Sequence, residues 1–117
     1  MARPGVAPGR GEIWLAHLDP TVGREQAGTR FVLVVSNDYF NYGPAELVAI
    51  VPLTRTDRGL PLHVPIAEPE ANLIGRGVIL CDQPRTISKS RLVRRKGAVE
   101  PSTLLAVENR LRAFFAL

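Results

Sequence analysis

Apolar residues form short runs separated by turn residues along most of the chain, and they follow a helical spacing only toward its end. Short runs rich in Val, Ile and Leu and bounded by Gly, Pro, Asn or Asp are typical of β-strands. This pattern predicts strands at 12–18, 31–36, 47–53, 60–67 and 78–81. In the fourth run Pro61, His63 and Pro65 alternate with apolar residues, so we expect an edge strand with His63 on its exposed face.

The C-terminal segment has the period of a helix. The apolar positions that fall on one helical face are Leu104, Val107, Leu111 and Phe114. Pro101 fits the first turn of this helix, with Glu100 or Ser102 as the N-cap. Short strands followed by a single helix predict a mainly β (α+β) domain, a small and strongly bent sheet or barrel on which the helix packs.

Composition is that of an ordinary globular domain. Of the 117 residues, 45% are hydrophobic and 22% are charged, which is enough for one domain with a modest core. We expect residues 10–117 to form this domain and residues 1–9, which are rich in Pro and Gly, to be a flexible leader. Because no apolar run approaches the roughly 20 residues of a membrane span and no hydrophobic signal region is present, we expect a cytoplasmic protein.

The charge balance favours a polyanionic partner. Lys and Arg total 15 against 11 acidic residues, and the resulting charge of +4 suits nucleic acid, although it also serves solubility alone. The single cysteine, Cys81, excludes an internal disulfide and a multi-cysteine zinc site. His17 and His63 lack the spacing of metal ligands, so we expect no metal and no other cofactor. The sequence also lacks a glycine-rich phosphate loop and the elbow motif of serine hydrolases.

Four polar residues at predicted strand ends provide the remaining chemistry: Glu25, Arg30, Thr54 and Asp82. Cleaving RNA without a metal needs a group that takes the 2′-hydroxyl proton, a cation that stabilises the phosphorane, and an acid for the departing 5′ oxygen. The planar guanidinium of Arg30 suits the second task, and the Thr54 hydroxyl can hold a phosphate oxygen. Glu25 or Asp82 suits proton transfer. A plainer interpretation is a surface ion pair between Glu25 and Arg30, with Thr54 and Asp82 as turn residues.

Several sequence runs together resemble the MazF/PemK/Kid toxins. These runs are 10–15 (RGEIWL), 18–23 (LDPTVG), 25–30 (EQAGTR), 34–38 (VVSND), 51–54 (VPLT) and 81–87 (CDQPRTI). They occur in the order and spacing of that family, and the resemblance extends from Gly9 to the C-terminal helix. It implies an SH3-like barrel of the PemK/CcdB type with a C-terminal α-helix.

The resemblance also implies an activity. Toxins of this family act as homodimers in type II toxin–antitoxin systems, and they are metal-independent endoribonucleases that cut short motifs in single-stranded RNA, chiefly mRNA. Their products carry 2′,3′-cyclic phosphate and 5′-hydroxyl ends. By motif match, the catalytic Arg and Thr of the family fall on Arg30 and Thr54, and its loop Glu falls on Glu25. The Asp that the Kid-like branch uses as acid or base falls on Asp82.

This chain departs from the family pattern at two positions. Phe31 stands where the family commonly has Pro after the catalytic Arg, and Arg24 stands where the Kid-like branch has a His. Because a guanidinium does not deprotonate near neutral pH, Arg24 is not a general base, although it can bind phosphate. The identity of the base is left open between Glu25 and Asp82.

Other residues are candidates for binding RNA and a protein partner. Tyr39, Phe40 and Tyr42 can stack bases, although a core or dimer-interface role is the alternative for at least one of them. The arginines that can hold backbone phosphates are Arg55, Arg58 and Arg85, whereas the basic run 94–96 is expected to be a solvated face. An acidic, disordered antitoxin tail is expected to compete with RNA for the basic groove. Two alternatives are a non-enzymatic toxin of the CcdB type, which binds DNA gyrase, and an RNA-binding barrel without turnover.

Overall fold

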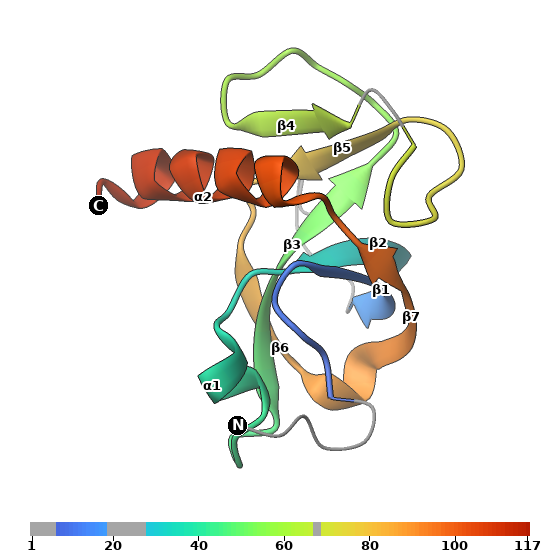
Figure 1. The fold of residues 1–117 in the computed structure, drawn as a ribbon, viewed down its shortest axis with the longest axis vertical. Helices are drawn as coiled ribbons and strands as arrows, with labels where there is room; N and C mark the ends of the chain where they lie inside the picture. Colours follow the sequence, from blue (N-terminus) through green and yellow to red (C-terminus); the bar gives the residue numbers. More distant parts are fainter. Residues whose placement is uncertain (1–6, 19–27, 67–68) are drawn as a thin grey trace.

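The computed structural model describes residues 7–18, 28–66 and 69–117, which form an antiparallel sheet with a long C-terminal helix (Figure 1). The strands of this part of the chain are β1 (Glu12–Leu18), β2 (Gly28–Val34), β3 (Leu47–Thr54), β4 (His63–Ile66), β5 (Gly77–Leu80), β6 (Arg85–Ser88) and β7 (Leu92–Ala98). The helices are α1 (Asp38–Asn41), the 3-10 helix η1 (Lys89–Arg91) and α2 (Pro101–Phe115). The predicted mainly β class with a C-terminal helix is confirmed.

Strand order places β3 at the centre of the sheet. Hydrogen-bonded neighbours follow the order β4-β5-β3-β2-β1-β7, and β6 also pairs with β3. The ladders of β5 and β6 use successive stretches of β3, because Leu53 faces Ile79 and Ile50 faces Arg85. Ile79 and Arg85 are six residues apart, whereas their partners on β3, Leu53 and Ile50, are only three residues apart. The connection 81–84 is therefore longer than the stretch of β3 that it follows. Pro52, which has no N–H to donate, lies at this interruption.

The apolar side chains form two buried clusters, one on each side of the curved sheet. The first contains Ile13, Leu33 and Ile79 and is covered by α2, whose Val107 is fully buried. The second contains Trp14 and residues of β2, β3 and β6. In Figure 1, α2 crosses over the end of the sheet that carries β3 and β5.

The helix α2 begins as predicted, with Glu100 as the N-cap and Pro101 at the first helical position. Its predicted apolar face is only partly covered, since Leu104 and Leu111 are half-buried and Phe114 remains exposed. In the described part of the chain, no helix has the length and apolar character needed to span a membrane.

The loop predicted around residues 37–44 contains the short helix α1. The Asn37 side chain caps it, because its Oδ1 accepts a hydrogen bond from the N–H of Phe40 at 2.8 Å. Asn41, at the end of α1, is fully buried and donates through Nδ2 to the Ser36 carbonyl at 2.9 Å. The polar residues that suggested an open loop therefore form an ordered turn against β3.

Three further sequence predictions are wrong in detail. Strand β2 begins at Gly28 instead of residue 31, so Arg30 lies inside a strand. The edge strand β4 is shorter than predicted, and His63 is buried instead of exposed. Residues 94–96 belong to β7, a strand that was not predicted and that pairs with β1, and Arg94 and Arg95 are exposed, as expected of a solvated face. Strand β6 was not predicted either.

A buried carboxylate connects β7 to the start of the domain. Glu12 accepts hydrogen bonds at Oε1 from the N–H of Gly9 at 2.7 Å and from Nε1 of Trp14 at 3.1 Å. Its Oε2 accepts from Nε of Arg95 at 2.7 Å. Residues 1–6 of the predicted flexible leader lie outside the described residues, whereas Pro8 and Gly9 are buried.

Candidate active site

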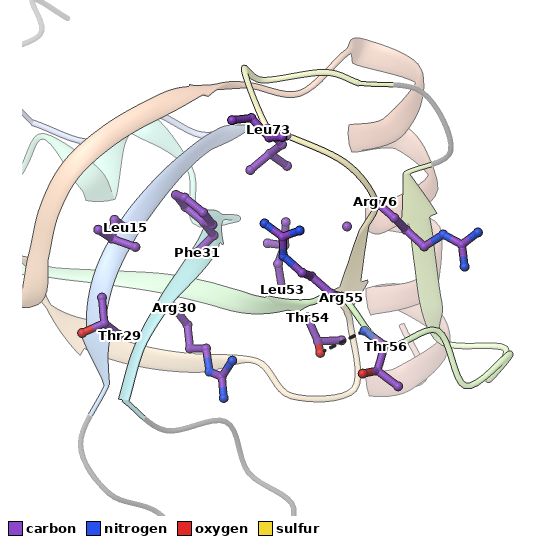
Figure 2. Close-up of a pocket in the computed structure, with 12 residues that line it drawn as sticks. Leu15, Thr29, Arg30, Phe31, Leu53, Thr54, Arg55, Thr56, Leu73 and Arg76 are labelled. Atoms are coloured by element: carbon purple, nitrogen blue, oxygen red, sulfur yellow. Dashed lines mark hydrogen bonds between the residues drawn. The ribbon is translucent and has the colours of Figure 1, made fainter.

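Arg30 and Thr54 line one cavity of about 300 Å³ between the ends of β2 and β3 (Figure 2). The register explains their proximity. Strands β2 and β3 pair through Val32 and Pro52, and Arg30 and Thr54 lie two residues beyond this last pair on their own strands. Continuing the antiparallel register brings the two side chains to facing positions. The hydrogen-bonded ladder between β2 and β3 ends at the pair Val32 and Pro52, before it reaches Arg30 and Thr54. The ends of the two strands therefore line a cavity.

The lining of the cavity combines cationic and apolar side chains. Its guanidinium groups come from Arg30, Arg55 and Arg76, and its described lining contains no carboxylate. The apolar part of the lining is formed by Leu15, Phe31, Leu53, Leu73 and Ile74. Lys96 adds a further cation, with Nζ 5.8 Å from the centre of the Phe31 ring. Guanidinium groups around an open cavity are suited to binding phosphate oxygens.

The Thr54 hydroxyl is oriented by its own backbone. Its oxygen accepts a hydrogen bond from the N–H of Thr56 at 3.3 Å, which is the dashed line in Figure 2. A hydroxyl that accepts in this way still has its proton to donate to another acceptor. In Figure 2 the Arg30 guanidinium and the Thr54 oxygen point to the same side of the cavity. Together they offer donors to one anionic group.

Asp82 lies in the connection between β5 and β6, beside a second and smaller cavity. Its Oδ1 is 3.0 Å from Nε2 of His63. The smaller cavity, of about 50 Å³, is lined by Thr54, Thr56, Arg58, His63, Leu80 and Gln83. The two cavities share Thr54 and Thr56, and Asp82 contacts the second cavity's lining through His63.

The other predicted site residues are placed differently. Arg24 and Glu25 lie outside the described residues. Arg85 is half-buried opposite Ile50 and belongs to the lining of neither cavity. Tyr39 and Phe40 lie on α1 and border a separate apolar depression of about 430 Å³, where Tyr39 is 79% exposed. The structure therefore gathers Arg30, Thr54, Arg55 and Arg58 around adjoining cavities and leaves the aromatic pair elsewhere.

Sequence reasoning missed two residues of the site. Arg76 lies between two glycines in the loop before β5, and nothing in its local pattern distinguishes it from a solvated turn residue. His63 alternates with apolar residues in a way that indicates an outward side chain, and only the contact with Asp82 shows its place. Among the described residues, no three His, Cys, Asp or Glu side chains gather to form a metal site.

Comparison with known families fits this arrangement. The family model that matches residues 9–115 is described as the PemK-like, MazF-like toxin of type II toxin-antitoxin systems. The chain belongs to the PemK/MazF toxin family. Its seven-stranded antiparallel sheet with a C-terminal helix is accordingly the PemK fold, which confirms the SH3-like barrel of the PemK/CcdB type.

Curated relatives of the PemK/MazF family are similar over most of the chain. Endoribonuclease MazF of Staphylococcus epidermidis is 36% identical over 103 residues, which cover 87% of this chain and 86% of that protein. Endoribonuclease EndoA of Bacillus subtilis is 36% identical over 109 residues, which cover 92% of this chain and 94% of that protein.

Solved structures of the family have the same fold. The crystal structure of MazF from Deinococcus radiodurans has a TM-score of 0.83 at 27% identity and covers 95% of this chain and 98% of its own. An endoribonuclease from a mycobacterial species, in complex with its cognate antitoxin, has a TM-score of 0.77 at 29% identity, covering 95% of this chain and 97% of its own.

Proposed function

We propose that this chain is the toxin of a type II toxin–antitoxin pair and acts as an endoribonuclease on single-stranded RNA without a metal ion. The observation that carries the proposal is the cationic cavity in which Arg30 and Thr54 meet from facing strand ends. Family membership and two curated relatives named endoribonucleases support the same activity. They disfavour the alternative of a CcdB-like toxin that binds gyrase.

The proposed reaction is an internal transfer of the phosphodiester. The 2′ oxygen attacks phosphorus while its proton passes to a carboxylate, either Glu25 or Asp82, and the bond from phosphorus to the 5′ oxygen breaks. The 5′ oxygen takes up a proton, so the products are a 2′,3′-cyclic phosphate and a 5′-hydroxyl. Arg30 and the Thr54 hydroxyl, which line the same cavity, would stabilise charge on the phosphorane oxygens. Arg55 and Arg58 line the adjoining cavities and would hold the RNA backbone, Arg24 is proposed as a further phosphate-binding residue, and Arg85, Tyr39 and Phe40 would contact flanking nucleotides.

We propose an acidic antitoxin tail as the protein partner. The mycobacterial relative was solved with its cognate antitoxin, and another Deinococcus structure, at 26% identity, contains MazE with MazF. An acidic segment would bind the same guanidinium groups as RNA and so exclude it. We also infer a homodimer and a cytoplasmic location from the family. A protein that sediments as a monomer at micromolar concentration would contradict the homodimer.

The test is incubation of the purified chain with a long single-stranded RNA in EDTA, followed by mapping of the cut ends. We expect cuts at one short motif, cyclic phosphate ends, and a loss of rate of about 100-fold or more in Arg30→Ala and Thr54→Val. Arg112→Ala, which removes an exposed arginine at the far end of α2, is the matched control and should cut normally. RNA that stays intact would refute the proposal and lead to a gyrase supercoiling assay. Binding by both wild type and Arg30→Ala without any cutting would indicate an RNA-binding barrel instead.

A further inference from the structure

His63 is a buried histidine whose side chain meets a half-exposed carboxylate. The exposed fraction of the side chain is 4% for His63 and 32% for Asp82. The atoms in contact are Nε2 of His63 and Oδ1 of Asp82, 3.0 Å apart. Pairing of β4 with β5 creates this contact, because it sets His63 opposite Leu80, two residues before Asp82. The turn that follows is closed by a hydrogen bond from the N–H of Gln83 to the Leu80 carbonyl at 3.1 Å.

The other ring nitrogen of His63, Nδ1, is buried and has no hydrogen-bond partner among the described residues. An ionised carboxylate only accepts hydrogen bonds, so the nitrogen that faces Asp82 carries the proton. The imidazole is therefore a fixed donor with a single acceptor in the described structure, Asp82.

Packing by itself does not explain an imidazole at this position. A buried nitrogen without a partner destabilises a fold about as much as one hydrogen bond to a carboxylate stabilises it. A phenyl ring would fill the same space without an unpaired nitrogen. What the imidazole adds is a fixed orientation for Asp82, since a ring held between strand β4 and the following connection determines where Oδ1 lies.

The fixed orientation of Asp82 matters because His63 lines the small cavity next to Thr54. Gln83, the neighbour of Asp82, lines it as well. With Oδ1 held by the imidazole, Oδ2 is the oxygen that a bound molecule can meet. A carboxylate held on one oxygen keeps its second oxygen in a defined place, as reacting groups require.

We propose that His63 is a positioning residue for this site, and that it holds Asp82 in the orientation in which Oδ2 exchanges a proton with RNA bound beside Thr54. The inference rests on the proposed ribonuclease function. It assigns a role to His63 that acts through Asp82 and involves no contact between the imidazole and the substrate.

The test compares two substitutions of His63 in the full-length chain, with a short single-stranded RNA that contains the mapped cleavage motif. His63→Phe keeps the ring volume and removes the donor, whereas His63→Gln places an amide N–H near the former position of Nε2. We expect His63→Phe to lower kcat about 10- to 100-fold with KM within about threefold, because the loss concerns orientation and not binding. His63→Gln should recover most of kcat.

A double-mutant comparison separates positioning from folding. In the Asp82→Asn background, which has already lost the carboxylate, adding His63→Phe should lower kcat by no more than about twofold. An equal loss in both backgrounds would overturn the inference, and so would a wild-type kcat in His63→Phe. If the wild-type protein cuts no RNA, both the proposed function and this inference are refuted. If the wild-type protein and His63→Phe cut RNA equally well, only this inference is refuted.

A measurement on the unaltered histidine covers the case in which His63→Phe does not fold. Nitrogen-15 spectra of the wild-type protein should show the His63 ring protonated at Nε2, with the signal of a hydrogen-bonded proton. Asp82→Asn should shift that signal and leave the His17 signals in place. A ring protonated at Nδ1 only would contradict the proposed contact.

Discussion

Substitution of Glu12 by Ala should strongly destabilise the domain. The Glu12 side chain is 7% exposed, and the change removes the acceptor of the buried Trp14 indole N–H and of the buried Gly9 N–H. Each buried donor without a partner costs about 1–3 kcal/mol. Arg95, whose side chain is 46% exposed, loses its partner but regains water, so it contributes little. We therefore expect a loss of about 3–5 kcal/mol in the free energy of unfolding, a large part of the roughly 5–15 kcal/mol of a typical domain.

The assay is urea unfolding followed by the fluorescence of Trp14, the single tryptophan of the chain and a neighbour of the altered residue. Far-UV circular dichroism monitors the same transition independently of this residue. For a domain of this size the expected loss corresponds to a fall in Tm of about 10–20 °C. Glu12→Gln should be intermediate, because Oε1 keeps accepting from Gly9 and Trp14 while the ion pair with Arg95 is lost.

Glu108→Ala is the matched control. Glu108 pairs with Arg10, and the side chains of both residues are nearly one-third exposed, at 29% and 28%. Exposed pairs of this kind contribute about 0–1 kcal/mol. An unfolding free energy for Glu12→Ala within about 1 kcal/mol of the wild type, or the same urea midpoint as Glu108→Ala, would contradict a structural role for the buried carboxylate.

Two further predictions concern the core and a close backbone contact. Burial raises the pKa of the Cys81 thiol to about 12, so iodoacetamide at pH 8 should alkylate the folded protein at least 10-fold more slowly than the urea-unfolded chain; equal rates by mass spectrometry would contradict this. A Cβ at Gly97 would lie 2.5 Å from the Ala71 carbonyl oxygen, so Gly97→Ala should lower the free energy of unfolding by about 1–3 kcal/mol or more. Gly77→Ala, where the nearest side-chain atom is 3.6 Å away, is the comparison, and equal unfolding midpoints for the two variants would disprove the clash.

Local patterns in the sequence were sufficient for much of the fold and for part of the site. Strands β1 and β3 and the helix α2 match their predicted ranges closely, because each has a strong apolar period and clear turn residues or a proline at its end. The motifs containing Arg30 and Thr54 pointed to a shared anion site. The described structure places both side chains in the lining of one cavity.

Pairing between distant strands decided what local patterns missed. Strand β7 has three successive basic residues at its centre and carries no apolar alternation, so its strand character comes from the ladder with β1 and from the contact between Arg95 and the buried Glu12. Strand propensity of this kind depends on neighbours more than on the residues themselves. Strand β6 has only four residues and is polar at both ends, and it forms because it can pair with β3.

The amino-acid sequence by itself determined the class of the fold, the positions of the main strands and the cationic character of the site, because these follow from period and charge along a few residues. Only the tertiary structure decided that His63 turns inward. Local alternation placed it on the exposed face, whereas the register of β4 against β5 brings it to Asp82, nineteen residues later. A local pattern cannot predict a hydrogen bond between residues so far apart in the sequence. The bond forms only once the pairing of β4 with β5, and of β5 with β3, has fixed the positions of His63 and Asp82.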